Sequence, residues 1–387
     1  MYGHRFLRRA VLTICLMLAG LLLAAGAAAK PRAHRVSAAA CPVARKHATR
    51  RCARHVRAHS RRRQRPARRS LSHGKASATT ATTSNTMRPF APTSLWNAPL
   101  AANAPLDPRS STYVANLLSQ IASAGTWINT YAYSTPVFTV PANQPTVTVK
   151  LDAGFSDAMQ ALQQTWTAVP IPANANPASG TDAQMVIWQP ATDTMWEFWC
   201  ASRQPDGWHA RWGGTMYHVS SNPGYYTAPQ PSWGATASSL PLIGGLIRPS
   251  ELAAGHIDHA LALAIPQTQA QYFAWPAQRT DGSVYVTSAI PEGQRFRLDP
   301  RIDLSKIPMA PIVKMIATAA QKYGIVIRDQ AGAVTFYAED TDAEGVRNPY
   351  YGPNGYFENQ YVNNLLKSFP WTHLQALRDR LSCCWHS

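Results

Sequence analysis

One segment of this chain cannot form a folded core, and it limits where folding can occur. Between Lys30 and Lys75 there are 16 lysine or arginine residues and no acidic residue. These charges repel one another, and the few large apolar groups cannot offset the entropy lost on ordering the segment. We therefore expect residues 30–87, which end in a Thr/Ser/Ala linker, to be a disordered basic arm. Globular structure is expected in residues 88–387.

The segment before the arm is typical of a secretory signal. Residues 1–29 place Arg5, Arg8 and Arg9 before an aliphatic run that ends in alanine and glycine. This order of charged, apolar and small residues favours export followed by cleavage. An uncleaved membrane anchor is the alternative, because about 20 apolar residues can span a bilayer. The sequence predicts a secreted or cell-envelope-associated protein, in a compartment that permits disulfides.

The formal net charge of +17 does not describe the globular part. The first 75 residues hold 19 basic groups, which leaves 18 basic against 20 acidic residues in the rest of the chain. We expect the arm to bind anionic envelope polymers through salt-sensitive contacts, and a solvated linker without a partner is the alternative. Nothing in the nearly neutral remainder indicates specific nucleic-acid binding, and we expect a monomer.

The pattern of residues 88–387 is that of a mainly β protein. Eight short runs rich in aromatic and β-branched residues are separated by Pro, Gly, Asn and Asp turns. Because no helical pattern separates them, they favour an antiparallel β-sandwich or jelly roll. Helical spacing predicts an N-terminal helix over 111–124, capped by Ser110 and ended by Gly125, and a C-terminal helix over 311–323 followed by a β-hairpin of IVIRD and AVTFYAE. The eight runs are STPVFTVP, PTVTVKLD, QMVIWQP, TMWEFWCA, GWHARWGGTMYHV, HALALAIP, SVYVTSA and RFRLDP.

The hairpin formed by the third and fourth runs can be resolved into faces. A four-residue loop over 190–193 places Val186 opposite Glu197. Glu197 then shares one face with Trp199 and Gln184, while the other face is wholly apolar and better suited to the core. One residue of register decides whether the next strand adds tryptophans or polar residues to the Glu197 face. The two alternatives are Trp208, Ala210 and Trp212, or His209 and Arg211.

An open sheet face of this composition suits a polysaccharide, because aromatic rings stack on sugars while carboxylates and amides bind hydroxyls. Glu197 is the best candidate for a catalytic acid or nucleophile. A glycosidase needs a second carboxylate roughly 5–9.5 Å away, for which the candidates are Asp182, Glu251 and Asp258. A lyase would instead use His259 or a tyrosine as its base. The expected substrate-binding residues are Gln184, Trp199, Arg211, Trp212 and Arg248, of which either arginine suits a substrate carboxylate.

The stretch GHIDHALALAIP, residues 255–266, has a second group of polar residues at the start of an aliphatic strand. Alternation places His259 on the bulky side with Leu261 and Leu263, so it is either a hydrogen-bonded core histidine or a group at the lip of a cleft. Asp258 lies on the alanine side, where another segment must approach closely. We expect Asp258 to have a structural role, with His259 and Glu197 lining one cleft.

Several stretches resemble a family of secreted bacterial proteins of the actinobacterial type. They are SLWNAPLAANAPLDPRSSTYVANLL, VIWQPATDTMWEFW, GWHARWGG, GGLIRPSELAAGHIDHALALAIP, WPAQRTDG and PEGQRFRLDP. The resemblance covers nearly all of residues 91–377 but supplies no reaction. It implies that Asp182, Glu197, Glu251 and His259 are the site residues. The family's Asp-x-His motif has Gln184 in place of its histidine here, which weakens any metal site or mechanism that needs two histidines.

Motifs for nucleotide binding, serine hydrolysis and zinc proteolysis do not occur in the sequence, so neither a cofactor nor a metal is expected. The loop DTDAEG, residues 340–345, begins like a calcium loop, but Tyr351 stands where a glutamate is required. The sequence predicts an extracellular carbohydrate-active protein, most simply a polysaccharide hydrolase or lyase. The alternative is a non-catalytic glycan-binding or cell-wall-associated protein, which a flat aromatic surface with Glu197 and His259 apart or buried would favour.

Overall fold

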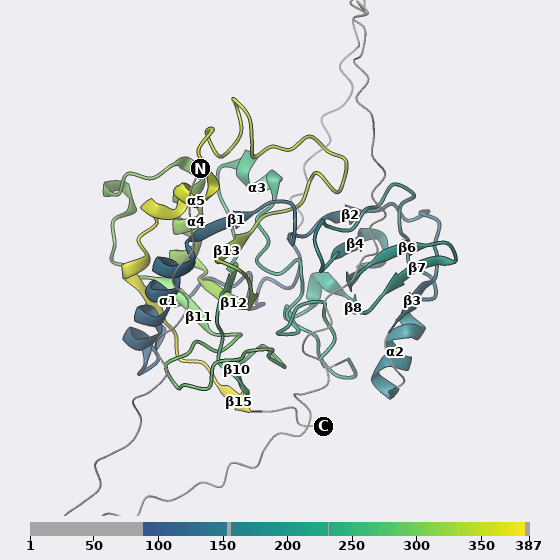
Figure 1. The fold of residues 1–387 in the computed structure, drawn as a ribbon, viewed down its shortest axis with the longest axis horizontal. Coiled ribbons are helices and arrows are strands. Elements are labelled where there is room, and N and C mark those ends of the chain that lie inside the picture. The colour runs from purple at the N-terminus through teal and green to yellow at the C-terminus, as the bar shows by residue number, and fades with distance from the viewer. Residues whose placement is uncertain (1–87, 153–155, 231, 384–387) are drawn as a thin grey trace, which may run out of the picture. The chain divides into compact units, whose positions relative to one another are not determined.

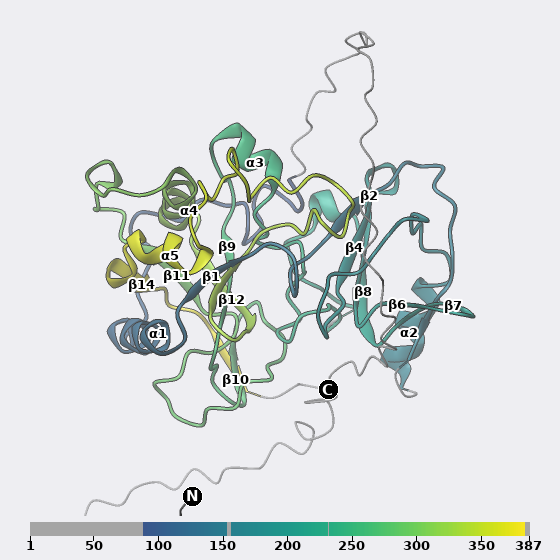
Figure 2. The ribbon, with the colours of Figure 1, turned by 45° about the horizontal axis from the view of Figure 1, so that its top comes forward.

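A computed structural model of the chain describes residues 88–152, 156–230 and 232–383. The expected signal, basic arm and linker lie outside these ranges. The described residues belong to one compact unit, which Figures 1 and 2 show from two directions. Within these ranges, no helix combines the length and the apolar character that crossing a membrane requires.

The described chain is mainly β, as the sequence predicts, with short helices between the strands (Figure 1). The helices are α1 (Ser110–Ala124), α2 (Asp157–Thr165), α3 (Pro249–Ala254), α4 (Pro311–Lys322) and α5 (Val362–Leu365). The strands are β1 (Thr126–Asn129), β2 (Val137–Thr139), β3 (Val149–Leu151), β4 (Met185–Gln189), β5 (Thr194–Trp199), β6 (Ser202–Gln204), β7 (Gly207–Ala210), β8 (Trp212–Tyr217), β9 (Leu261–Ile265), β10 (Tyr272–Ala274), β11 (Arg295–Leu298), β12 (Ile325–Gln330), β13 (Val334–Tyr337), β14 (Leu374–Ala376) and β15 (Leu381–Cys383).

Two larger sheets carry most of the described core. The six-stranded sheet has the order β1-β13-β9-β12-β11-β14, and the four-stranded sheet has the order β2-β4-β5-β8. Strands β3, β7 and β6 form a third sheet, and β10 pairs with β15. In both views the four-stranded and three-stranded sheets lie with α2 on one side, and the six-stranded sheet lies with α1, α4 and α5 on the other (Figures 1 and 2).

The sheets are mixed, so a purely antiparallel sandwich or jelly roll is not confirmed. Parallel pairs are β1 with β13, β9 with β12, β2 with β4, and β3 with β7. Each parallel pair joins strands separated by long connections, which local periodicity does not reveal. The run SVYVTSA forms no strand. It contributes only a single bridge between Val284 and Gln269, while Tyr285 and Val286 are exposed.

The expected C-terminal hairpin is also wrong. Strands β12 and β13 are present, but β9 lies between them, parallel to β12 and antiparallel to β13. The sequence pattern identified both strands and the short turn that joins them. It could not show that a strand from about 60 residues earlier occupies the space between.

Both expected long helices are confirmed. Gly125 and Gly324 follow α1 and α4 with φ values of +76° and +94°, which favour glycine at a helix end. Ser110 is the first residue of α1 rather than its cap, and its hydroxyl accepts a hydrogen bond from the backbone N–H of Ala376 at 2.8 Å. This hydrogen bond links the start of α1 to β14.

Strand β9 separates two apolar cores. Leu261, Leu263 and Ile265 pack with α1, α4 and α5. Its alanine face packs toward the four-stranded sheet. A Cβ on Gly245 would lie 2.2 Å from the backbone nitrogen of Ala262, so another segment does approach this face closely, as alternation predicts.

Candidate functional site

Glu197 lies in the middle of β5 and is completely buried. Its Oε1 accepts a hydrogen bond from the backbone N–H of Ala235 at 2.7 Å, and its Oε2 accepts one from Leu242 at 2.8 Å. Burial raises the pKa of Glu197 to about 7, although these two amides and the charge of Arg328 lower it. The carboxyl group therefore holds residues 235–242 against the sheet.

The expectation of an open sheet face at Glu197 is wrong. Strand β5 is buried on both faces from residue 194 to residue 198. One face packs on Trp166, whose ring centroid lies 4.8 Å from that of Phe198, and residues 232–246 cover the other. The hairpin register is confirmed, with Val186 opposite Glu197. A catalytic role for Glu197 stays a prediction of the sequence alone.

Two tryptophans at one end of the paired strands β5 and β8 are partly exposed. Trp199 ends β5 and Trp212 begins β8, and the two residues are paired across the strands. Nε1 of Trp199 donates a hydrogen bond to Oδ1 of Asp182 at 3.3 Å. The guanidinium of Arg279 lies 5.8 Å from the ring centroid of Trp212. The structure thus brings together three expected site residues, Asp182, Trp199 and Trp212, which we call the tryptophan cluster.

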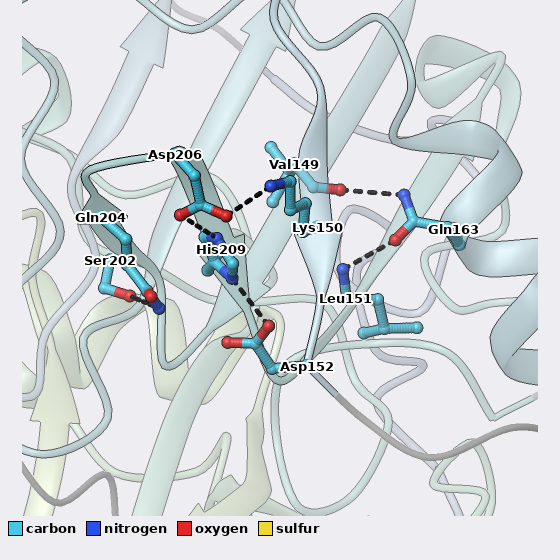
Figure 3. Close-up of polar contacts among 9 residues, drawn as sticks. All are labelled: Val149, Lys150, Leu151, Asp152, Gln163, Ser202, Gln204, Asp206 and His209. Carbon is cyan, nitrogen blue, oxygen red and sulfur yellow. Dashed lines mark hydrogen bonds and ion pairs between the residues drawn. The ribbon is translucent and has the colours of Figure 1, made fainter.

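Neither expected register holds as a whole, because the run GWHARWGGTMYHV forms two strands rather than one. Trp212 in β8 is opposite Trp199 and joins its face, whereas Trp208, His209 and Ala210 belong to β7 in the three-stranded sheet. There Nδ1 of His209 lies 2.7 Å from Asp152, and Nε2 lies 3.0 Å from Asp206, which also pairs with Lys150 (Figure 3). Burial opposes charge on the ring, but the hydrogen bonds to the two carboxylates raise the pKa of His209. His209 is thus part of a separate polar cluster.

The other expected binding residues contact the protein itself. Gln184 is buried, and its amide donates hydrogen bonds to the carbonyl oxygens of Tyr133 and Ser134. Arg248 makes a two-pronged ion pair with Glu339. Arg211 is partly buried beside the tryptophan cluster, where its backbone N–H donates to the carbonyl of the last residue of β5 at 3.0 Å. Of these residues, Arg211 lies closest in sequence to the cluster.

Glu251 and His259, two further expected site residues, are in contact in the structure. Nε2 of His259 lies 3.1 Å from Oε2 of Glu251, and Nδ1 lies 2.8 Å from the carbonyl oxygen of Ala260. A carbonyl oxygen only accepts hydrogen bonds, so both ring nitrogens donate when Glu251 is ionised. Oε2 of Glu251 also accepts from the backbone N–H of Arg248, which fixes the start of α3.

This pair predicts a defined pH window of stability. Burial opposes both charges, but Glu251 raises the pKa of His259, and His259 and Arg248 lower the pKa of Glu251. The histidine contribution is complete below its usual 6.5 and is lost as the pH rises through the raised value. The glutamate contribution is complete above its usual 4.5 and is lost as the pH falls through the lowered value. Both contributions are therefore complete between pH 4.5 and pH 6.5.

We expect His259→Gln to lower the free energy of unfolding by about 2–4 kcal/mol near pH 5.5, because it leaves Glu251 buried without its partner. The loss should shrink as the pH rises above 6.5 and through the raised pKa of His259, where the wild-type pair weakens. Urea unfolding at several pH values measures both. His256→Gln is the matched control, since that side chain is 63% exposed. A loss that is the same at every pH, or equal for the two variants, would contradict the assignment.

The sequence predicts one cleft lined by both His259 and Glu197, but Glu197 is completely buried. His259 contributes to a small hollow whose lining does not include Glu197. Asp258 accepts a hydrogen bond from the hydroxyl of Tyr323 at 3.2 Å and lies 3.0 Å from His256. The hollow is lined by Pro89, Phe90, Trp96, Asn97, Ile243, Gly245, Leu246, Arg248 and His259.

Three carboxylates that the sequence did not single out converge near the tryptophan cluster. Carboxylate oxygens of Asp281, Glu292 and Asp329 all lie within 4.8 Å of one another. Burial, with the nearby charges of Asp281 and Asp329, raises the pKa of Glu292 well above its usual range. Burial and Asp281 raise the pKa of Asp329 to about 7, and Asp182 adds to this effect from the tryptophan cluster. We call these residues the carboxylate triad.

No protein-family model, curated protein or solved structure matches this chain. The carboxylate triad was not predicted because its members come from three separate segments, RTDG, PEGQ and IRDQ. Each is an ordinary acidic residue in a turn or at the end of a strand, and no spacing links them. No local signal marks Glu292, because its neighbours in PEGQRF are largely polar and its burial is visible only in the structure.

Proposed function

We propose that this chain is an extracellular glycan-binding protein without catalytic activity, and that the tryptophan cluster is its binding surface. Partly exposed indole rings offer apolar faces for sugar rings. Asp182 lies beside them and supplies carboxylate oxygen for sugar hydroxyls, and the positive charge of Arg279 lies 5.8 Å from the ring centroid of Trp212. The proposed ligand is a polysaccharide or cell-wall glycan.

The observation that carries this proposal is the enclosure of Glu197. A catalytic acid or nucleophile has to reach its substrate, and both oxygens of Glu197 bind backbone amides under residues 232–246. His259 also has both ring nitrogens engaged by the protein. The two main catalytic candidates, Glu197 and His259, are thus held by the protein, whereas Trp199 and Trp212 are partly exposed. This combination supports binding over hydrolysis or elimination.

Two further observations support an extracellular setting. Cys200 is disulfide-bonded, and such bonds persist mainly in oxidising compartments. The 16 basic residues between Lys30 and Lys75 would attract the anionic polymers of a cell envelope. In this proposal the basic segment retains the protein near the envelope, and the tryptophan cluster recognises the glycan.

The proposal predicts that Trp199→Ala and Trp212→Ala each weaken glycan binding about tenfold. A stacked aromatic side chain contributes on the order of 1.4 kcal/mol, which corresponds to that factor. Affinity electrophoresis of the full chain through gels containing each member of a polysaccharide panel identifies a ligand and measures the loss. The same panel, assayed for released reducing ends and unsaturated products, tests for turnover.

Trp127→Ala is the matched control, because Trp127 is 36% exposed and lies in β1, outside the cluster. It should leave binding unchanged. Equal retardation of the wild type and both cluster variants would contradict the proposed surface. Turnover that disappears in Glu197→Gln while the fold is retained would replace the binding function with a catalytic one.

A further inference from the structure

The carboxylate triad contains a buried carboxyl group whose charged form the protein does not compensate by hydrogen bonds of good geometry. Glu292 is 0% exposed, and neither of its carboxylate oxygens has a hydrogen-bond partner of good geometry among the described residues. Removing a carboxylate from water without such partners is very costly. Either a proton or a bound cation must therefore balance Glu292.

The positions of the other two carboxylates favour a cation. Oxygens of Asp281 and Asp329 lie within 4.8 Å of the Glu292 oxygen and of one another. Calcium binds oxygen ligands at about 2.3–2.6 Å, so oxygens on opposite sides of one ion lie roughly 4.6–5.2 Å apart. The triad thus fits within the span of one calcium coordination sphere. Calcium accepts a wider range of such separations than magnesium, which demands near-ideal octahedral geometry at about 2.0–2.1 Å.

The remaining lone pairs allow this coordination. Oδ1 of Asp329 accepts one hydrogen bond at 2.8 Å, from the backbone N–H of Gln330, and Oδ2 accepts a longer one at 3.3 Å from Ala237. Asp281 is exposed and accepts from the side chain of Gln330, which leaves its solvent side open to water ligands. Carboxylates with added water are the oxygen donors that a hard divalent cation prefers.

The nearby arginines do not occupy the triad. Arg279 donates hydrogen bonds to the carbonyl oxygens of Ser232, Gly234, Thr236 and Ala237. Arg328 donates to the carbonyl oxygens of Leu242 and Gly244. These hydrogen bonds direct both guanidinium groups to backbone oxygen, so the arginines act on the triad as charges at a distance. A divalent cation together with the single charge of Arg279 would balance three ionised carboxylates.

We propose that Asp281, Glu292 and Asp329 bind one divalent cation of the size of calcium. The ion would join the turn containing Asp281, the segment before β11 and the end of β12. Because Ala237 donates to Asp329 and its neighbour Ala235 donates to Glu197, the ion would also stabilise the segment that covers β5. This inference does not depend on glycan binding.

The test uses the full chain after treatment with a chelator and dialysis. Calcium added to about 100 times its dissociation constant should raise the melting temperature by about 5 °C. Isothermal titration should give one ion per chain. Glu292→Gln, which keeps the size of the side chain, should abolish both the shift and the binding, and Asp281→Asn provides a second variant at an exposed position in case the first fails to fold.

Asp342→Asn is the matched control, because it removes a carboxylate from the loop over 340–345, the other stretch with acidic residues spaced like calcium ligands. It should retain the full calcium shift. Loss of the shift in this control with retention in Glu292→Gln would place the ion elsewhere and overturn the proposal. Absence of any shift or heat of binding with calcium, magnesium or manganese would show that a proton balances Glu292.

Discussion

Replacing Glu197 with leucine is expected to lower the free energy of unfolding by about 3–5 kcal/mol. Leucine has a similar volume but accepts no hydrogen bond, so the backbone N–H groups of Ala235 and Leu242 would be left buried without partners. Each such group costs about 1–3 kcal/mol. Urea unfolding near pH 5 measures the loss. A change below about 1 kcal/mol would contradict the role of Glu197 as the anchor of its covering segment.

Glu197→Gln is the matched variant, because its amide retains one acceptor oxygen. Since burial raises the folded pKa of Glu197 from 4.5 to about 7, its contribution is complete below 4.5 and is lost as the pH rises through about 7. The glutamine has no such ionisation. The stability advantage of the wild type over Glu197→Gln should therefore fall by about 3 kcal/mol across this range. An advantage that grows with pH would contradict the raised pKa.

Gly213→Ala is expected to be at least as damaging, with a loss of about 4 kcal/mol or failure to fold. A Cβ at this position would lie 1.9 Å from the carbonyl oxygen of Glu197 and 2.9 Å from the ring of Trp166. The first contact is with backbone in a buried sheet, so no side-chain rotation relieves it. Yield of soluble protein and urea unfolding measure the effect.

Gly332→Ala is the control for this substitution. It lies in the turn between β12 and β13, and a Cβ there meets nothing within 4 Å. We expect a change of less than about 1 kcal/mol, with a small gain because alanine restricts the unfolded chain. Similar losses in both glycine variants would show that the close packing of β5 against β8 is not what makes Gly213 necessary.

Features set by local chemistry could be predicted from the sequence. The spacing of apolar residues and a following glycine located α1 and α4, and the four-residue loop after Gln189 gave the register of β4 against β5. These features depend on contacts between residues close in sequence. Alternation along β9 likewise separated its bulky face from its alanine face, and the structure confirms that separation.

Features set by distant segments could not be predicted. Glu197 was assigned to an open face because its strand alternates, but residues 232–246 have no periodic pattern that would reveal them as a cover. The same limit applies to the carboxylate triad, whose members are brought together by three separate turns and strand ends. Glu251 and His259 are an intermediate case. They are only eight residues apart, and the family resemblance names both as site residues, but no local pattern predicts the contact between them that the structure shows.

The position of β9 between β12 and β13 has a consequence for the order of events during synthesis. When LALAI leaves the ribosome, its neighbours on both sides lie about 60 residues or more downstream. At roughly 5–20 residues per second, this strand remains without its partners for about 3–12 s. An unpaired, uncharged run of this kind is prone to associate with other chains. The nascent protein therefore has an interval in which residues 261–265 are exposed to association with other chains.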